Sequence, residues 1–442
     1  MMASHTTLEV KFLELLEAKQ SLQTSRPKIQ KVPQYLRNGN KFDKHYSPKS
    51  VSIGPILHDN QNLKLGENYK LIWAAKYIRN TQFSPEFLHK KIFDNIDELK
   101  VLFAEDVLAL ASTAESLKGF RSLEEKLSWL LFVDGCFLLY ILDVKVNRIF
   151  DDQHDNQEDN IKFDQLFLLL MTDVLLLENQ LPFLVLKLLW KNDKENELID
   201  TMMNFLTYYH WAVRDIQDKL SNESQPPTHL LDLHRKMILT TSNHKTKKRV
   251  KYSKSKQGTR KADRNIEDLR ASGVKLKSSG TARPSDIHFR GDGFSAQLTL
   301  PEIFMDNITT SSFLNLIAYE MCPDFKNDYG ITSFAVFMDS LIDHAEDVKI
   351  LRSKGILVNS RRSDEEVADL FNIISTDLIF NPETYFEVKT KLQEHHFNKC
   401  KIWFMEGYHT YFSNPWAIIG FLGAFIALSL TFIQTWFSVF PR

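Results

Sequence analysis

The stretch AIIGFLGAFIALSLTFIQTWFSVF, residues 417–440, decides the architecture of the chain, because none of its 24 residues is Asp, Glu, Lys or Arg. As an α-helix it would be about 36 Å long, enough to cross a hydrocarbon core of roughly 30 Å. Aromatic residues lie at both ends, where Tyr and Trp favour the headgroup level. The sequence therefore predicts a lipid-bound membrane anchor over 406–442, in which we single out Pro415, Trp416, Ala417, Gly420, Gly423, Ala427, Trp436 and Phe440.

Basic residues flank the apolar stretch mainly on one side. Four lysines between residues 389 and 401 precede it, whereas Arg442 alone follows it. Because positive flanks stay on the cytoplasmic side, we expect the large N-terminal part to be cytosolic. The opening residues MMASHTTLEV contain no apolar core of a signal peptide. These features predict a single-pass, tail-anchored protein of the plasma membrane or an endomembrane.

Small residues recur along the predicted anchor. Gly420 and Ala424 are four residues apart, and so are Gly423 and Ala427, so both pairs lie on one side of a helix. This spacing lets two membrane helices approach closely, although Gly and Ala are common in membrane spans anyway. A homodimer formed through the anchor is therefore one expectation from the sequence.

The composition of the 442-residue chain favours long helices. Fifteen Gly and 14 Pro are about half the usual share, which disfavours sandwiches, barrels and glycine-rich nucleotide folds. The 55 Lys and Arg nearly balance 56 Asp and Glu, so we expect no nucleic-acid partner. Three widely separated cysteines form neither a disulfide framework nor a metal motif, which indicates a reducing compartment.

Apolar residues repeat every three to four positions through most of residues 29–405, which predicts one multi-helical domain after a variable amphipathic segment at 1–28. Alternating patterns at 274–277, 287–290 and 296–300 predict a small antiparallel β element. The predicted fold is therefore mainly α, with one C-terminal transmembrane helix. The helices expected within the domain span 66–80, 85–118, 122–150, 162–181, 182–191, 195–220, 311–321, 331–345, 363–376 and 383–405.

A basic insert at 241–264 interrupts the domain, and residues 245–264 hold ten Lys and Arg against one Asp. Such a block is usually a solvated, disordered segment. The functional alternatives are nuclear import, RNA contact and binding to an anionic cytosolic leaflet. With a membrane anchor in the chain, leaflet binding is the most economical of the three, at about 1 kcal/mol per basic residue.

No phosphate-binding loop, dinucleotide fingerprint, zinc-protease motif, nucleophile elbow or kinase motif occurs in the sequence. We therefore expect no cofactor and no metal. Five carboxylates nevertheless lie within apolar runs, namely Asp134, Asp173, Glu178, Glu320 and Asp339. A pair of them would suit general acid–base catalysis, whereas a structural role would have them bind backbone amides or cap helices. Pro182 favours the structural role, because Glu178, Asn179 and Gln180 can cap a helix that begins after it.

An ordered set of motifs over 29–440 includes Val32, Pro33, Gly54, Pro55, Asp134, Gly135, Cys136, Phe137, Glu178, Asn179, Gln180, Pro182, Asn315 and Glu320. Together these motifs resemble those of the plant-specific "domain of unknown function 247" family. The resemblance implies a membrane-associated plant protein of a family without an established activity, some grass members of which resemble pollen self-incompatibility determinants. One departure is that a single histidine, His58, follows Gly54-Pro55, where the family has a pair.

Three functions follow as hypotheses. The first is a membrane-tethered, non-enzymatic interaction or recognition protein with an unidentified protein partner. The second is a hydrolytic enzyme that uses the buried carboxylates, and the third is a nuclear or RNA-associated factor that uses the basic insert. The first agrees best with an anchored chain that lacks catalytic motifs.

Overall fold

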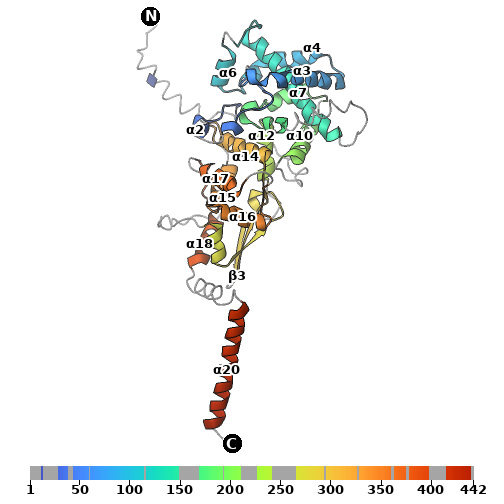
Figure 1. Cartoon of the computed structure of the whole chain (residues 1–442). Coiled ribbons are helices and arrows are strands. Elements are labelled where there is room, and N and C mark those ends of the chain that lie inside the picture. Colours follow the sequence, from blue (N-terminus) through green and yellow to red (C-terminus); the bar gives the residue numbers. More distant parts are fainter. Residues whose placement is uncertain are drawn as a thin grey trace.

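The protein is described from a computed structural model. The structure describes residues 11–12, 28–37, 43–58, 60–113, 116–148, 169–192, 194–210, 226–240, 265–292, 295–325, 328–359, 363–374, 378–397 and 415–439. Nearly all of 1–28, the basic insert at 241–264 and Phe440 lie outside these residues. Figure 1 shows an elongated helical body followed by one long C-terminal helix, which confirms the mainly α fold class.

The N-terminal half of the body, coloured blue to green in Figure 1, packs around one long helix, α7. Helix α7 is apolar around much of its circumference, so it is buried on most sides. Its core contacts include Trp73, whose ring stacks on that of Phe137 at 5.8 Å between centroids. The elements of this half are α2 (Gln34–Arg37), η1 (Asp43–His45), η2 (Gln61–Leu63), α3 (Lys64–Asn80), α4 (Pro85–Asp94), α5 (Ile96–Lys100), α6 (Glu105–Ala111), α7 (Leu123–Arg148), η3 (Leu177–Asn179), α9 (Phe183–Leu189) and α10 (Glu195–Tyr209).

The C-terminal half of the body packs around α14, whose residues from Thr309 to Glu320 are all buried. An Asp306–Thr309 capping box fixes its start, with each residue bonding the other's backbone N–H. The helices of this half are α12 (Leu230–Leu239), α13 (Ile266–Ala271), η4 (Pro284–Asp286), α14 (Asn307–Glu320), α15 (Gly330–Asp339), α16 (Ala345–Ser353), α17 (Asp364–Ile374) and α18 (Phe386–Phe397).

The three predicted strands are present as β1 (Val274–Ser278), β2 (His288–Asp292) and β3 (Ser295–Leu300). The expectation of a wholly antiparallel sheet is wrong, because the strand order is β1-β3-β2 and β1 runs parallel to β3. Only the pair of β2 and β3 is antiparallel. The chain passes from β1 to the far edge before β3 enters the middle. A second parallel pair joins β4 (Ile303–Met305) to β5 (Leu357–Asn359), and these three-residue strands are too short for a sequence pattern to predict.

Several predicted helices are shorter in the structure. The helix expected at 85–118 is three separate helices, because the backbone leaves the helical conformation at Asn95 and is extended at Ala104. Helix α15 ends at Asp339 rather than at 345, and α10 ends at Tyr209. The described part of the helix expected at 162–181 ends at Asp173.

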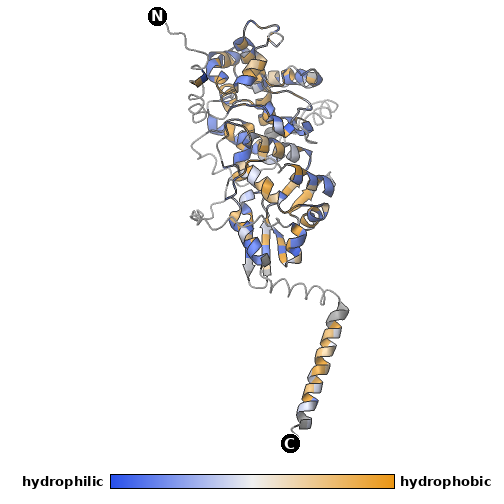
Figure 2. Cartoon of the chain, turned by 90° about the vertical axis from the view of Figure 1, so that its left-hand side faces the viewer, coloured by the Kyte–Doolittle hydropathy of each residue, from blue (hydrophilic) through white to orange (hydrophobic). Residues whose placement is uncertain are grey.

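The apolar C-terminal stretch forms α20 (Pro415–Val439), which stands apart from the body in Figure 1. It is the only described helix long and apolar enough to cross a membrane, and none of its window Ile419–Trp436 is buried in the structure. Figure 2 shows apolar residues along its length, whereas the ribbon of the body alternates between apolar and hydrophilic residues. By length and composition alone, α20 could span a bilayer.

Candidate functional site

An N-terminal strap, residues 28–37 and 43–58, joins the two halves of the body. It contains little regular structure, so its backbone N–H groups need partners from elsewhere in the fold. The buried carboxylates and amides that the sequence analysis singled out supply many of these partners. The candidate site is therefore a network of polar side chains that bind the strap.

Asp134 lies on α7, and its side chain is only 2% exposed. Its Oδ2 accepts a hydrogen bond from Gly54 N at 2.7 Å, and its Oδ1 pairs with Lys70 Nζ at 2.8 Å. Lys70 also pairs with Glu67, which in turn accepts from Ser52 Oγ at 2.7 Å. Burial alone would lower the pKa of Lys70, but the two carboxylates outweigh it, so its pKa lies above the ordinary value. This buried lysine is held in its charged form.

Gly54 reaches Asp134 in a conformation that suits only glycine. Its φ is +80°, and a Cβ atom there would lie 3.1 Å from the carbonyl oxygen of Gln180. Pro55 is buried beside it. The Gly54-Pro55 motif thus turns the strap where it passes α7.

Asp173 binds three consecutive amides of the strap. Its carboxylate accepts from the backbone N–H groups of Lys49, Ser50 and Val51 at 2.9, 2.7 and 3.1 Å, and from Ser50 Oγ at 2.5 Å. Burial raises the pKa of this carboxyl, and these four donors oppose the rise. The group acts as a fixed acceptor for a non-helical segment.

Glu178 binds the beginning of the strap. Its Oε1 accepts from Val32 N at 2.8 Å, and its Oε2 pairs with Arg37 Nη2 at 2.9 Å. Arg37 also bonds Asp43 at 2.7 Å. Pro33, which follows Val32, is half-buried and has no N–H to satisfy.

Asn179 and Gln180 hold different segments. Asn179 accepts from Ile53 N at 3.0 Å and donates to Val51 O at 2.9 Å. Its side-chain amide therefore makes the same two kinds of hydrogen bond with the strap that a peptide group of a neighbouring strand would make. Gln180 Oε1 instead accepts from Leu231 N at 2.9 Å, at the first turn of α12. The expectation that this segment caps the helix after Pro182 is wrong, because α9 has no side-chain cap. Pro182 ends the turn, and the polar side chains before it bind distant backbone instead.

Asn315 connects the strap to α14. Its Oδ1 accepts from Leu177 N at 2.8 Å, and its Nδ2 donates to the carbonyl of His45 at 2.9 Å. The His45 ring bonds Ser311 Oγ at 2.7 Å. One amide side chain thus joins three segments that are far apart in the sequence.

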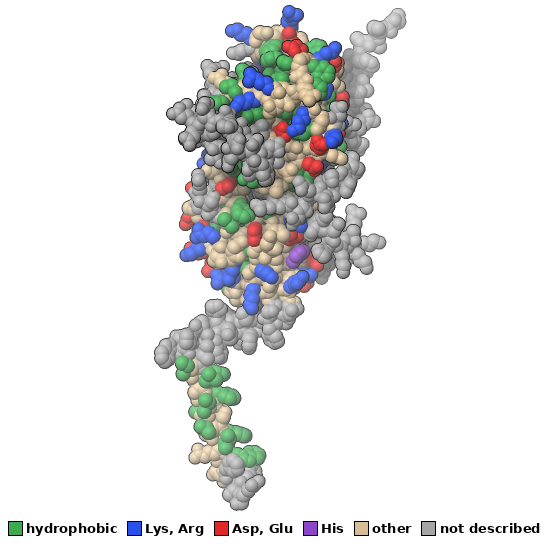
Figure 3. Space-filling view, turned by 90° about the vertical axis from the view of Figure 1, so that its right-hand side faces the viewer, with side chains coloured by type: hydrophobic (Ala, Val, Ile, Leu, Met, Phe, Trp, Pro, Cys, Tyr) green, Lys and Arg blue, Asp and Glu red, His purple; other side chains and the backbone are tan. Residues whose placement is uncertain are grey.

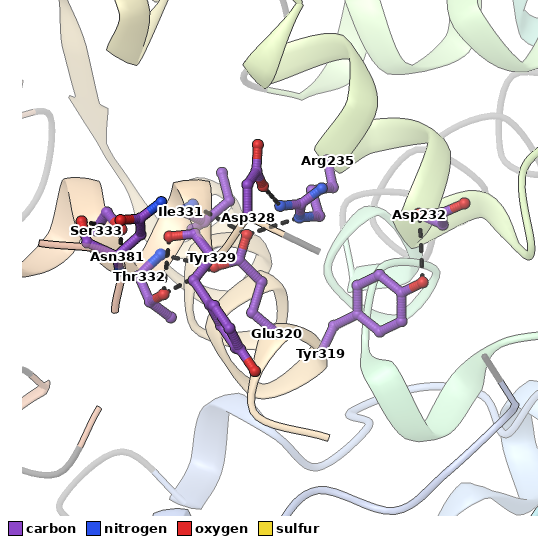
Figure 4. A network of polar contacts seen from close by, with 10 residues as sticks. All are labelled: Asp232, Arg235, Tyr319, Glu320, Asp328, Tyr329, Ile331, Thr332, Ser333 and Asn381. Carbon is purple, nitrogen blue, oxygen red and sulfur yellow. Dashed lines mark hydrogen bonds and ion pairs between the residues drawn. The ribbon is translucent and has the colours of Figure 1, made fainter. Parts of the chain in front are cut away.

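Glu320, at the end of α14, caps a neighbouring helix, as Figure 4 shows. It accepts from Ile331 N at 3.0 Å and Thr332 N at 2.8 Å, in the first turn of α15. Arg235 on α12 donates from Nε to Glu320 Oε1 at 2.6 Å and from Nη2 to Asp328 Oδ1 at 2.5 Å. A carboxylate at a helix N-terminus is favourable for the helix dipole. The arrangement joins α12, α14 and α15.

The remaining motif residues pack in the core. A Cβ atom on Gly135 would lie 2.5 Å from Leu189 Cδ1, so glycine permits the close approach of α7 and α9. Cys136 and Phe137 are fully buried. Burial raises the pKa of the Cys136 thiol, which makes it a poor nucleophile.

Four of the five predicted buried acids are buried, namely Asp134, Asp173, Glu178 and Glu320, whereas Asp339 is only half-buried. Asp134, Asp173 and Glu178 each accept at least one backbone N–H from a segment 80 or more residues away, and Glu320 accepts two from the next helix. In the part of the chain that the structure describes, no three His, Cys, Asp or Glu side chains are grouped to hold a metal ion. The geometry is that of a structural network.

Sequence reasoning missed the cationic partners of this network. Lys70 precedes Trp73, Ala74 and Tyr77 at spacings of three, four and seven, and all four residues are buried. That spacing places Lys70 on the core face of α3, so a lysine in an apolar stripe was the available signal. Arg235 offers a weaker signal, because α12 is buried on most sides.

Comparisons with known proteins agree with the resemblance in the motifs. The model of a plant family, DUF247, described as "Plant protein of unknown function", matches residues 29–430. UPF0481 protein At3g47200 of Arabidopsis thaliana is 28% identical over 414 residues, which cover 89% of this chain and 82% of that relative. Putative UPF0481 protein At3g02645 of the same plant is 22% identical, and the match covers 89% and 87%. No solved structure matches the chain significantly. Since the family model matches well over half of its length, the chain belongs to the DUF247 family of plant proteins.

Proposed function

We propose that the protein is a membrane-tethered, non-enzymatic interaction protein, which holds its helical body at the cytosolic face of a membrane. The observation that carries the proposal is α20, an apolar helix whose window Ile419–Trp436 is unburied in the structure. A helix that is apolar on all sides and is not buried against the described part of its chain is suited to lipid. The partner of the body is proposed to be another protein, as for recognition proteins generally.

The contacts of the buried acids support the non-enzymatic part of the proposal. A general acid or base needs a carboxyl that can exchange a proton with a substrate. Asp134, Asp173, Glu178 and Glu320 instead face backbone N–H groups and fixed cations. The hydrolase alternative would need one of them to leave these partners, and the RNA alternative depends on an insert outside the described residues.

Charges placed in α20 test the anchor. Phe425 and Leu428 are 62% and 71% exposed, and replacing both by arginine should cost about 5–7 kcal/mol of insertion free energy. We expect the Phe425→Arg, Leu428→Arg variant to move from the carbonate-resistant membrane fraction to the supernatant. The matched control is Leu71→Arg, Ile72→Arg on α3, where both side chains are also at least half exposed, and it should stay in the membrane. Extraction of the wild type by carbonate would contradict the proposal.

The cytosolic orientation has its own test. We expect the sequons at Asn222 and Asn307 to carry no glycan in native protein from plant membranes. A mass shift on glycosidase treatment would place the body in the lumen. In sealed vesicles whose cytosolic face points outward, added protease should digest an N-terminal tag and leave a tag after Arg442 protected.

A further inference from the structure

The sheet of β1, β2 and β3 has one apolar and one polar face. Val274, Leu276, Ala296, Leu298 and Leu300 are buried on the inner face, which is covered in part by α13 and α18. The ring of Phe289 also points inward, 5.9 Å from that of His395 on α18. The opposite face is open to solvent.

The exposed face carries basic side chains at both edges. Lys275, Gln297 and Arg290 are cross-strand neighbours in one row, and Lys277, Thr299 and His288 form the next row. Lys275, Lys277, His288 and Arg290 are exposed, and Gln297 and Thr299 are half-buried between them. None of these six residues is acidic, and Asp292, the last residue of β2, lies on the same face by register. We call these six residues the basic sheet face.

The cations of the basic sheet face are unused within the described part of the fold. No ion pair or hydrogen bond joins the side chains of Lys275, Lys277 or Arg290 to another described residue. By contrast, Lys70 and Arg235 in the core pair with acids. A group of cations without an acidic partner among the described side chains is complementary to an anionic surface.

This face lies at the end of the body nearest to α20. Figure 1 shows the strands running toward that end, and Figure 3 shows Lys and Arg side chains gathered there. Residues 398–414 connect α18 to α20, and 17 residues can span at most about 60 Å. The body is therefore tethered close enough for this end to reach the membrane surface.

We propose that the basic sheet face docks on the anionic phospholipid headgroups of the leaflet in which α20 is anchored. The inference rests on the proposed function, because α20 supplies the tether. A tether converts a weak surface contact into an intramolecular one, so few cations suffice. Each basic side chain near an anionic leaflet raises the docking equilibrium roughly fivefold. Docking would fix which side of the body faces away from the membrane.

Lysine acylation of the full-length chain in liposomes tests the docking. A membrane-impermeant amine reagent, with mass spectrometry, reports the reaction rate of each outward-facing lysine. In phosphatidylserine-containing liposomes we expect Lys275 and Lys277 to react several-fold more slowly than in pure phosphatidylcholine. Lys90 and Lys118, exposed at the other end of the body, should react equally in both. Equal rates at Lys275 and Lys277 in the two lipids would overturn the proposal.

A double variant separates docking from the general field of the membrane. In Lys277→Gln, Arg290→Gln, the docking equilibrium should fall about 25-fold, so Lys275 should recover its phosphatidylcholine rate. The matched control Lys118→Gln, Arg79→Gln removes the same charges from exposed sites on the far end and should keep Lys275 protected. Persistent protection in the double variant would overturn the proposal.

Two further outcomes are distinguishable. If carbonate extracts the wild-type chain from the liposomes, the proposed anchor fails, whatever the lysines show. If the chain is retained and an RNA oligonucleotide, but not phosphatidylserine, slows Lys275, the leaflet is not the ligand and the docking proposal is overturned in favour of a polyanion.

Discussion

The helical body and α20 arrange their polar groups in opposite ways. In the body, buried polar side chains bind backbone that is distant in the sequence, as Asp173 does across 123 residues and Asn315 across 270. In α20, Ser429, Thr431 and Thr435 each donate a hydroxyl hydrogen bond to the carbonyl four residues earlier, at 2.8 Å. The body is held by long-range polar contacts, whereas these three hydroxyls of α20 are satisfied within about one turn.

The difference is the one expected if the body folds in water and α20, as proposed above, lies in lipid. In water an apolar core can be interrupted by polar groups that specify which segments meet, provided that each finds a partner. In lipid no water is present to satisfy a hydroxyl, so bonding within the helix is the stable solution. The comparison therefore predicts large effects from single polar substitutions in the body and almost none on folding from substitutions in α20.

The largest expected effect is at Asp134. Asp134→Ala leaves the Lys70 ammonium buried with Glu67 as its remaining partner and Gly54 N without its acceptor. Breaking a buried ion pair costs about 3–5 kcal/mol, and we expect a loss of that size in the free energy of unfolding. Chemical denaturation of the full-length protein in detergent, followed by near-UV circular dichroism, measures it.

A paired variant serves as the control. Asp134→Leu with Lys70→Met removes both charges and should recover part of the loss, because an apolar pair of similar volume avoids the buried charge. If the melting temperature of Asp134→Ala equals that of the wild type, the long-range polar contacts do not hold the body. Loss of a catalytic activity without loss of stability would favour the hydrolase alternative.

Acidification should destabilise the body through His229, at the start of α12. Burial lowers the pKa of His229 to about 4, with Asp232 opposing and Lys236 reinforcing the shift. The unfolded chain takes up the proton near pH 6.5 and the folded chain does not, so stability is present above that pH and falls toward pH 4. The fall is about 1.4 kcal/mol per pH unit and about 3 kcal/mol in all. Denaturation at pH 7 and pH 4.5 measures it.

His229→Asn isolates that contribution. His229 Nδ1 accepts from Asp232 N at 3.1 Å, and an asparagine oxygen can replace this cap without titrating. We therefore expect the variant to lose less stability than the wild type on acidification. Identical losses would mean that other groups dominate. His210, a second buried histidine whose pKa lies well below its ordinary value, should contribute in the same direction and remains in both proteins.

The sequence predicted most of the regions of structure and the burial of four of the five acids, but not their pairing. Helical spacing located most helices, and alternation located β1, β2 and β3, because these patterns are local. Apolar neighbours identified Asp134 and Glu320 as buried for the same reason. Their partners, Gly54 and Arg235, are 80 and 85 residues away, and no local pattern encodes which amide a carboxylate will meet.

The strand order shows the same limit. Alternation in β1 and β3 gives the buried face of each strand, but the parallel pairing of Val274 with Ala296 depends on the path of the whole chain. The apolar stretch of α20 was the opposite case. Its length and composition were sufficient to predict one long apolar helix, because the backbone hydrogen bonds of a helix form within the segment itself.

The smallest expected effect on the stability of the body is at Gly423, where a substitution should instead change the association of two copies of α20. Nothing lies within 4 Å of a Cβ atom placed there, so Gly423→Leu should leave the stability of the body and the localisation unchanged. If two copies of α20 pack through Gly420, Gly423, Ala424 and Ala427, a leucine blocks their approach. We expect energy transfer between differently labelled copies in liposomes to fall.

Ser429→Leu is the control for position on the helix. At 100° per residue, Ser429 lies roughly opposite the small residues of α20, so the substitution places the same leucine side chain on the other side. It also removes a hydroxyl whose bond stays within the helix, which should cost the fold nothing. Energy transfer should therefore fall for Gly423→Leu and persist for Ser429→Leu. Equal transfer in both variants would show that α20 does not pair the chains, and any dimer would then have to form through the body.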